Sequence, residues 1–372
     1  MNQWLRSISG PTKYQTSYMS QKTIILVFIL MIILCIGMWR FAVLWQVEQN
    51  QVTKTVVDQQ ATTTQLADLP EGVRYTESYT LPVANSAPTE MVRHTVPLPD
   101  IRQGCFRQDC IPSIEDPIYV PAADLADALA TSSLGIVLWD ANRFYPFPML
   151  ETHELVNDTL PDGSAVLISY CPLCGTGIVF NRNIDGAVEE FGVSGMLWQS
   201  NLLMYNRAQD IRNRNLWSQV LGQAVVGDRA GEMLEVVPSD IITFGDWLVA
   251  SPAGKTLTTG DPEDPYDGNY YSVASNLAPN FDAGTSLIAP ESYVHGLVIN
   301  GQAKAYLSKE LFDGMTDIVA GERIFVEIDN NKVTFIQTNA EGGKAPTELS
   351  DVEGFWFSWQ SAHPDTLLWI GE

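Results

Sequence analysis

Short apolar runs separated by turn residues dominate the chain beyond about residue 69. Seven runs of β-branched and aromatic residues read as strands: GIVLW, AVLISY, GIVF, IITF, HGLVI, RIFVEI and KVTFIQ. Helical spacing is rarer, and it predicts short helices at 121–130, 147–157, 245–251 and 308–315. The pattern therefore predicts an α+β fold that is mainly β.

One apolar stretch is longer than all the others. Residues 23–45 are apolar apart from one arginine near the end, and as a helix they would span roughly 34 Å, enough to cross a bilayer. Three basic side chains and no acidic one precede the stretch, which places residues 1–22 in the cytoplasm. A cleaved signal peptide is the alternative, but no small-x-small cleavage site follows. We expect a transmembrane helix that anchors a periplasmic or extracellular domain.

A linker and an internal repeat divide the rest of the chain. Residues 46–68 are rich in Gln and Thr without periodicity, which predicts a linker. Beyond it, a glycine is twice followed by a basic residue after eight positions and a tyrosine after ten: Gly135, Arg143 and Tyr145, then Gly296, Lys304 and Tyr306. Trp247 and Trp359 each stand four residues before a Ser-Pro or His-Pro step. We expect a duplicated β-rich unit, with residues 69–284 as the first copy and 285–372 as the second, shorter copy.

Several long motifs resemble a known family. They include DCIPSIEDPIYV, RFYPFPMLETHELVND, SYCPLCGTGIVFNR, FGVSGMLWQSNLLMYNR and FWFSWQSAHPDTLLW. With LWSQVLGQAVVG and DPYDGNYY they cover most of residues 101–372, and the chain is similar to the prokaryotic family known as domain of unknown function 3179. The resemblance implies an often exported or lipid-anchored protein with a duplicated architecture, and it implies no activity. The family pattern usually has His-Pro in both copies, whereas Ser251-Pro252 stands in the first copy here, so only His363 could serve a role that needs this histidine.

Charge narrows the choice of partners. Residues 1–45 hold four of the 21 basic side chains and no acidic one, which leaves 17 basic against 44 acidic side chains in the remainder, a net charge of −27. Nucleic acid and anionic lipid surfaces need a cationic face, so we exclude them as partners of the external part. A protein or glycan partner stays open.

Cys105 and Cys110 stand close together in GCFRQDC. In an oxidising compartment this spacing favours a local disulfide that closes a small loop. Two further ligands of a four-thiolate metal site are the alternative.

Cys171 and Cys174, in CPLCG, have the spacing of a metal-binding knuckle, in which two thiolates hold one ion. His153, in ETHELVND, precedes the strand that ends at the knuckle and is the candidate third ligand; a structural histidine that hydrogen-bonds inside the fold is the alternative. Such a soft set favours copper, and zinc is the competitor. Met196 or Met204 could add a thioether donor, although core packing is the favoured role for both. A non-catalytic surface module braced by a Cys171–Cys174 disulfide is the main alternative. A dithiol oxidoreductase is the second, although thioredoxin-like chemistry needs a helix after the pair and the following residues predict a strand.

The segment 191–207 is dense in Gly, Ser, Asn, Tyr, Arg and Trp, a mixture that can line a polar pocket. The candidate pocket residues are Arg143, Asn157, Asp158, Tyr205 and Arg207. These side chains could instead satisfy turns and hold strands together. Since no Ser-His-Asp order, phosphate-binding glycine loop or HExxH helix occurs, the motifs assign no enzyme class.

Overall fold

The computed structural model describes residues 72–82, 89–207, 215–261, 281, 284, 286–329, 332–338 and 345–371. All of them belong to the compact unit Thr62–Glu372. The predicted cytoplasmic segment 1–22, the anchor 23–45 and the linker 46–68 lie outside the described residues. Within the described ranges, no helix is long and apolar enough to cross a membrane.

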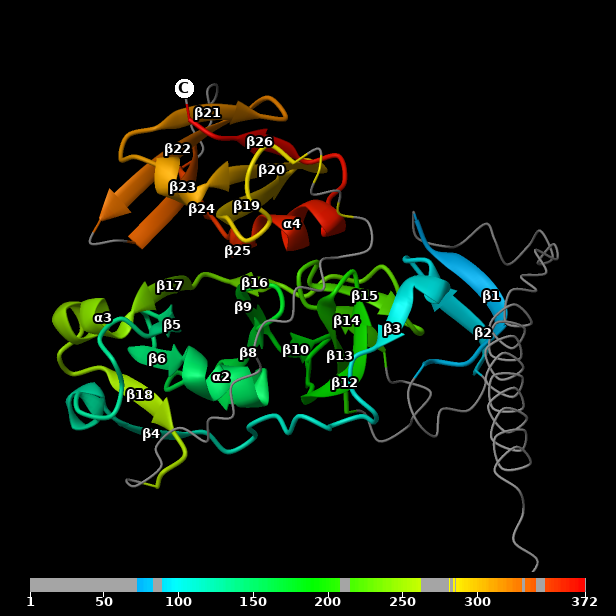
Figure 1. Ribbon diagram of the computed structural model, residues 1–372, viewed down its shortest axis with the longest axis horizontal. Coiled ribbons are helices and arrows are strands. Elements are labelled where there is room, and N and C mark those ends of the chain that lie inside the picture. The colour runs from blue at the N-terminus through cyan, green and yellow to red at the C-terminus, as the bar shows by residue number, and fades with distance from the viewer. Residues whose placement is uncertain are drawn as a thin grey trace, which may run out of the picture. The chain divides into compact units, whose positions relative to one another are not determined.

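Strands dominate the described chain, which confirms the mainly β class (Figure 1). The largest sheet has eight strands in the order β26-β20-β19-β25-β9-β8-β7, with β16 paired to β9. Its members are β7 (Leu155–Thr159), β8 (Ala165–Cys171), β9 (Thr176–Asn181), β16 (Val236–Val237), β19 (Tyr293–Ile299), β20 (Gln302–Leu307), β25 (Val352–Phe355) and β26 (Leu367–Trp369). Glu353 in β25 stands opposite Gly177 in β9. One sheet therefore joins the first segment, residues 72–261, to the second segment, residues 286–371.

Two further sheets belong to the first segment. The seven-stranded sheet, in the order β1-β2-β15-β14-β13-β12-β3, contains β1 (Arg74–Tyr79), β2 (Thr89–His94), β3 (Ile101–Gln103), β12 (Phe191–Trp198), β13 (Asn201–Asn206), β14 (Leu216–Ser218) and β15 (Gln223–Val226). The five-stranded sheet, in the order β17-β5-β6-β18-β4, contains β4 (Ile118–Pro121), β5 (Leu134–Leu138), β6 (Arg143–Pro146), β17 (Asp240–Thr243) and β18 (Lys255–Thr258). A two-stranded ribbon joins β10 (Asn183–Ile184) to β11 (Ala187–Val188).

The second segment adds a four-stranded sheet of β21 (Thr316–Val319), β22 (Glu322–Asp329), β23 (Lys332–Thr338) and β24 (Thr347–Leu349). Three α helices of seven residues each are described: α2 (Phe147–His153), α3 (Phe244–Ala250) and α4 (Trp356–Ala362). Figure 1 shows α4 against β19 and β25, and residues of these elements are in contact.

Strand β8 is apolar throughout because both of its faces are buried. Leu167 and Cys171 pack on one face, in a core cluster that includes residues of β12, β13 and β14. Val166, Ile168 and Tyr170 pack on the other face, in a cluster that includes residues of β5, β6 and β18. A strand that is buried on both faces does not need alternating apolar and polar residues. The sequence AVLISYC is therefore largely apolar along its whole length.

Of the predicted helices, the one at 245–251 is confirmed as α3, and the other three differ from the structure. The helix predicted at 121–130 is a 3₁₀ turn, η2 (Ala122–Leu125), and the one at 308–315 is η4 (Ser308–Glu310). The helix predicted at 147–157 ends at His153, because Glu154 adopts a φ of 58° and Leu155 begins β7. Burial of Leu155 and Val156 in the sheet overrides the local helical pattern.

The two segments share a strand order. The first contains β17-β5-β6-β18, with β18 parallel to β6, and the second contains β25-β19-β20-β26, with β26 parallel to β20. A helix precedes the last strand of each set. The hairpins differ in register, because Tyr145 pairs with Ile136 whereas Tyr306 pairs with His295. Gly135 and Gly296, which begin the two sequence repeats, therefore do not occupy equivalent positions in the two strand pairings.

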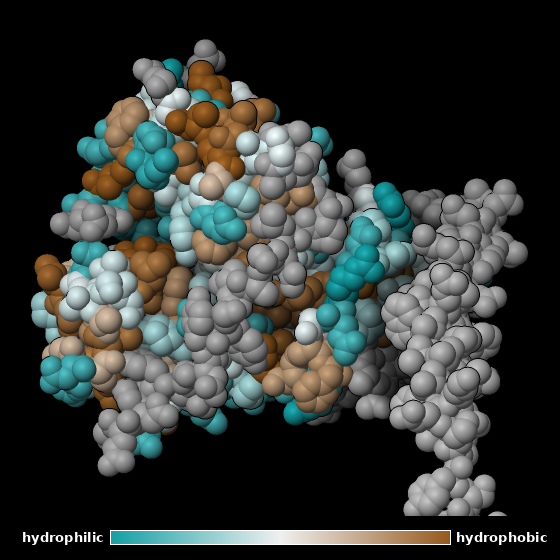
Figure 2. Space-filling view, in the orientation of Figure 1, coloured by the Kyte–Doolittle hydropathy of each residue, from teal (hydrophilic) through white to brown (hydrophobic). Residues whose placement is uncertain are grey.

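Large apolar side chains that reach the surface come from different elements. Val249 in α3, Phe106 in the Cys105–Cys110 loop and Ile318 in β21 are all exposed. On the face shown in Figure 2, apolar and hydrophilic residues are interspersed. Such scattered exposure is ordinary for a folded domain.

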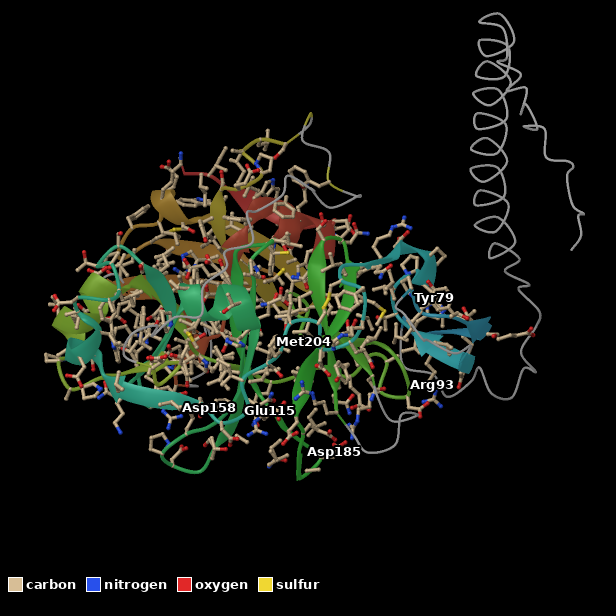
Figure 3. The ribbon with its side chains drawn as sticks, turned by 60° about the horizontal axis from the view of Figure 1, so that its bottom comes forward. Tyr79, Arg93, Glu115, Asp158, Asp185 and Met204 are labelled. Carbon is tan, nitrogen blue, oxygen red and sulfur yellow. A yellow bond between two sulfur atoms is a disulfide. The ribbon has the colours of Figure 1, made fainter. Side chains whose placement is uncertain are left out.

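Asp158 connects β7 to the β5–β6 hairpin (Figure 3). One carboxylate oxygen accepts hydrogen bonds from the hydroxyls of Tyr119 and Tyr145, both at 2.6 Å, and it also pairs with Arg143. The other oxygen accepts the backbone N–H of Thr159 at 2.7 Å. The side chain of Asp158 is only 2% exposed, so little water could solvate the carboxylate if its protein partners were lost.

We expect Asp158→Asn to lower the free energy of unfolding by about 3 kcal/mol, because a carboxylate only 2% exposed then no longer pairs with Arg143 and is replaced by a neutral amide beside two buried tyrosine hydroxyls. Asp317→Asn is the matched control, since Asp317 binds Lys304 and Tyr306 in the same manner with a side chain that is 21% exposed. For that control we expect about 1 kcal/mol. Urea denaturation followed by tryptophan fluorescence measures both. Equal losses would contradict the role given to burial.

A buried group of charges lies where the second segment meets the first. His295 Nδ1 is 2.7 Å from Asp351 Oδ2, and Asp240 accepts a hydrogen bond from the indole of Trp139. Burial alone would lower the pKa of His295, but the charges of Glu353 and Asp351 outweigh it and raise that pKa to about 9. Burial raises the pKa of Glu353 to about 7 and that of Asp240 to about 6.

These shifts predict that stability falls as the pH rises. His295 and Glu353 both bind a proton more tightly in the folded chain, so their contributions are complete below the unfolded pKa values and are lost as the pH passes about 7 and then about 9. Between pH 5 and pH 9 we expect the free energy of unfolding to decrease by on the order of 2 kcal/mol. Glu353→Gln should remove the part of this decrease below about pH 7, whereas Glu327→Gln, at an exposed position, should not. Denaturation curves across this pH range provide the measurement.

Candidate functional site

Cys171 and Cys174 lie in the turn that joins two antiparallel strands of the central sheet. Cys171 is the last residue of β8, and β9 begins at Thr176, so a strand follows the pair, as predicted. The N–H of Cys174 donates to the carbonyl of Cys171 at 3.0 Å. Both cysteines are free and buried. We call residues 171–175 the cysteine turn.

A strained hairpin supplies a backbone carbonyl to the two sulfurs. Gln199 and Ser200, between β12 and β13, have φ values of 52° and 62°. Two-residue turns of this kind favour Asn and Gly, and a left-handed conformation costs other residues roughly 1–2 kcal/mol each. The carbonyl of Ser200 accepts hydrogen bonds from Cys174 at 3.2 Å and from Cys171 at 3.9 Å. Backbone strain thus accompanies the placement of a carbonyl at the cysteine pair.

A buried network of polar side chains orients a donor toward Cys174. The amide of Asn201 donates to the sulfur at 3.5 Å and to Gln219 Oε1 at 3.0 Å. Gln219 also accepts from the Thr176 hydroxyl at 2.7 Å and donates to Ser169 Oγ at 3.3 Å. All four of these polar residues are buried. Because its members bond to one another, the network fixes the face that Asn201 presents to the sulfur.

The second segment closes the site from its other side. The N–H of Phe355, at the end of β25, donates to the carbonyl of Cys174 at 2.9 Å. The next turn of α4 carries Ser358, whose hydroxyl is buried without a hydrogen bond to any described residue. This hydroxyl lies near enough to the Cys174 sulfur to lower the pKa of the thiol.

The two thiols differ in their electrostatic surroundings. Burial raises the pKa of Cys171, and the neighbouring Cys174 and the charge of Glu154 raise it further. Burial alone would also raise the pKa of Cys174. Polar contacts with Cys171, Ser358 and Asn201 outweigh burial there and lower the pKa. The amide that Asn201 donates to Cys174 favours this thiol as the one that ionises first.

Glu154 is a residue of the site that the sequence analysis did not select. Its charge acts on both thiols, and burial of its carboxyl raises its pKa to about 8 although part of the residue stays exposed. Its backbone is fixed on both sides, since its N–H donates to Leu150 and its carbonyl accepts from Tyr170, both at 2.8 Å. Its position directly after His153, in the same ETHELVND motif, was the available signal.

His153 itself bonds elsewhere, with Nδ1 2.7 Å from the carbonyl of Pro112. Among the residues described, no group of three or more His, Cys, Asp or Glu side chains could hold a metal ion. Met204, labelled in Figure 3, belongs to the same buried cluster as Cys171 and Cys174, whereas Met196 belongs to a different one. Within the described part of the chain, the structure thus brings the two sulfurs and the Met204 thioether into one core and places the Nδ1 atom of His153 at the Pro112 carbonyl.

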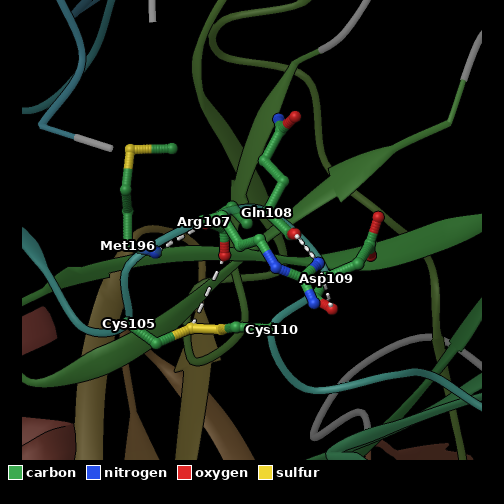
Figure 4. The surroundings of a disulfide bond; sticks show 7 residues. Cys105, Arg107, Gln108, Asp109, Cys110 and Met196 are labelled. Atoms are coloured by element: carbon green, nitrogen blue, oxygen red, sulfur yellow. Dashed lines mark hydrogen bonds between the residues drawn. A yellow bond between two sulfur atoms is a disulfide. The ribbon is translucent and has the colours of Figure 1, made fainter. Parts of the chain in front are cut away.

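Cys105 and Cys110 form a disulfide, with their Cα atoms 6.4 Å apart, in agreement with the expected local pairing (Figure 4). Figure 4 shows Arg107 and Gln108 within the closed loop. The N–H of Cys105 donates to Gly195 at 3.0 Å, which ties the loop to β12.

The five predicted pocket residues occupy three separate contacts. Arg143 and Asp158 pair with each other. The Asn157 amide exchanges two hydrogen bonds of 2.8 Å with the backbone of Phe191. Tyr205 and Arg207 both bind Asp109. A cavity of about 410 Å³ has other walls, which include Trp139, Asp240, Lys332 and Asp351.

The fold and the site together define a mainly β protein with a buried pair of thiols at the junction of two β-rich segments. The family model described as Protein of unknown function (DUF3179) matches residues 108–366, and the chain belongs to this family. The match includes the cysteine turn and Ser358 and begins between Cys105 and Cys110. Comparison with curated proteins and with solved structures found no match.

Gly175→Ala tests the contact between the cysteine turn and the second segment. Gly175 has a φ of 59°, and a Cβ there would lie 2.9 Å from the ring of Phe355. We expect a loss of about 3 kcal/mol in the free energy of unfolding, because backbone strain and displacement of the ring act together. We also expect iodoacetamide to alkylate the cysteines of the native protein faster.

Gly163→Ala is the matched control, since Gly163 has a φ of 92° with no atom within 4 Å of the added Cβ. Backbone strain alone should cost about 1–2 kcal/mol there and leave the alkylation rate unchanged. The same alkylation rate in both variants would show that Phe355 does not cover the cysteine turn.

Proposed function

We propose that the protein is a thiol–disulfide redox protein in which Cys171 and Cys174 alternate between a dithiol and a disulfide. The observation that carries the proposal is the asymmetry of the pair. Cys174 receives the side-chain amide of Asn201 and lies beside Ser358, while the described partners of Cys171 are backbone groups of Ser200 and Leu202 and the other thiol. Thiol–disulfide exchange by a cysteine pair needs a nucleophilic thiolate and a second, resolving thiol. This arrangement favours Cys174 for the first role and Cys171 for the second.

The sequence argued against redox chemistry because no helix follows the cysteine pair. Hydrogen-bond donors near Cys174 can take the place of the helix dipole. A helix after the pair lowers a thiol pKa through its dipole, and β9 follows here instead. Hydrogen-bond donors can favour a thiolate equally well, because they bind the charged form more strongly than the neutral form. Asn201 is such a donor, and the hydroxyl of Ser358 lies close enough to Cys174 to become one; both come from elements far from the cysteines in sequence.

The proposed reaction conserves atoms and electrons. The Cys174 thiolate attacks one sulfur of a disulfide on the reactant, and the other sulfur leaves as a thiolate. Cys171 then loses its proton, and its sulfur displaces the reactant from Cys174 to form the Cys171–Cys174 disulfide. Two electrons pass to the reactant, which leaves with two thiols. Glu154, with a pKa of about 8, supports this step because it can hold the proton that Cys171 releases.

Access to the sulfurs requires movement. Cys174 is fully buried and Cys171 is 2% exposed. We infer that the reactant reaches them when β25 and α4 move off the cysteine turn. In the closed state the cover protects reduced thiols, which a domain outside the cytoplasm needs. The Cys105–Cys110 disulfide supports such a location, as does the sequence of the proposed anchor at 23–45.

We also infer that the second segment is a duplicate of the first. The shared strand order and the carboxylates Asp158 and Asp317, each bound to a tyrosine and a basic residue, support this origin. Within the described residues, the copy holds no cysteine. It now contributes the cover of the site in the first segment.

The test of function is a redox titration of the full-length protein. We expect Cys171 and Cys174 to change together from two thiols to one disulfide in glutathione buffers of increasing potential, as measured by differential alkylation and mass spectrometry. A chain that carries Cys105→Ser and Cys110→Ser should behave alike, and Cys171→Ser should abolish the transition.

Two outcomes would contradict the proposal. Near-stoichiometric copper or zinc retained under anaerobic conditions, lost in Cys171→Ser and accompanied by no reversible disulfide, would establish a metal site. Thiols that neither oxidise nor bind metal in the native protein would leave the pair a structural role.

A further inference from the structure

Ser358 is unusual among the buried polar side chains of the second segment. It is 2% exposed, and its hydroxyl has no hydrogen-bond partner among the described residues. Ser361, in the next turn of α4, is also buried but donates to the carbonyl of Phe357 at 2.7 Å. A buried hydroxyl left without a partner costs roughly 1–3 kcal/mol. The same helix thus satisfies one serine and leaves the other without a bond.

The surroundings of α4 explain where the hydroxyl of Ser358 is directed. β25 leads into the helix, and the β25–β9 pairing places Glu353 opposite Gly177. The bond from Phe355 N–H to the Cys174 carbonyl then fixes the start of α4 on the cysteine turn. From this position the hydroxyl of Ser358 acts on Cys174 and lowers the pKa of that thiol.

We propose that Ser358 is a positioning residue of the redox site, whose hydroxyl donates a hydrogen bond to the Cys174 thiolate and so stabilises the reduced pair. This inference rests on the proposed redox function. A thiolate accepts a strong, charge-assisted hydrogen bond, whereas a disulfide sulfur is neutral and accepts only weakly. The unsatisfied hydroxyl therefore gains a partner in one redox state alone. The second segment is accordingly part of the chemistry of the site as well as its cover.

The reduction potential of the Cys171–Cys174 couple tests this role. In the full-length protein, Ser358→Ala should shift the equilibrium with glutathione about tenfold toward the disulfide, because the reduced form loses its donor. For a two-electron couple this shift corresponds to a potential about 30 mV lower. Ser361→Ala, which removes a buried hydroxyl from the same helix, should leave the potential unchanged. Ser358→Thr keeps the hydroxyl and should restore most of the shift.

The outcomes separate this inference from the function on which it rests. If the wild-type pair forms a reversible disulfide but Ser358→Ala has the wild-type potential, Ser358 has no such role and the redox function stands. Equal shifts in Ser358→Ala and Ser361→Ala would assign the effect to packing of α4 and overturn the inference. If the wild-type pair forms no reversible disulfide, the proposed function fails and the role of Ser358 fails with it.

Discussion

The pairing of β25 with β9 is the contact on which the rest of the structure depends. This pairing extends the central sheet from one segment into the other. Its residue in β9, Gly177, lies three positions after Cys174 in the sequence. Phe355 and α4 are held on the cysteine turn by the same strand. Glu353 in β25 and Asp351 just before it belong to the group of charges around His295. One short strand therefore couples the packing of the sheet, the electrostatics of the junction and the surroundings of the thiols.

Most groups that surround the two sulfurs come from parts of the sequence distant from the cysteines. The carbonyl of Ser200, the amide of Asn201 and the hydroxyl of Ser358 reach the sulfurs from a hairpin and a helix far along the chain. Two of these features are unfavourable by themselves, since the hairpin is left-handed at two residues without glycine and the hydroxyl is unsatisfied. Local cost concentrated around one pair of side chains indicates function rather than folding.

The sequence predicted the strands well and the site only in part. Runs such as AVLISY and RIFVEI are strands because β-branched and aromatic residues fit a sheet, and the amino-acid pattern carries that information locally. The helical patterns at 121–130 and 308–315 gave only single turns, since tertiary burial decides such short segments. The cysteine pair was evident from its spacing. Its partners were not, because no local pattern tells which distant turn or helix will reach a sulfur.

The segment that covers the cysteine turn lies far beyond it in the sequence. This order of synthesis affects how the protein folds and forms its disulfide. A nascent chain exposes Cys171 and Cys174 before β25 and α4 have been synthesised, at a stage when Cys105 and Cys110 are present as well. Cys105 and Cys110 are separated by five positions, so they meet by chance far more often than either meets the later pair. Their short loop thus consumes the competing thiols early and lowers the risk of mispairing until the last strands arrive.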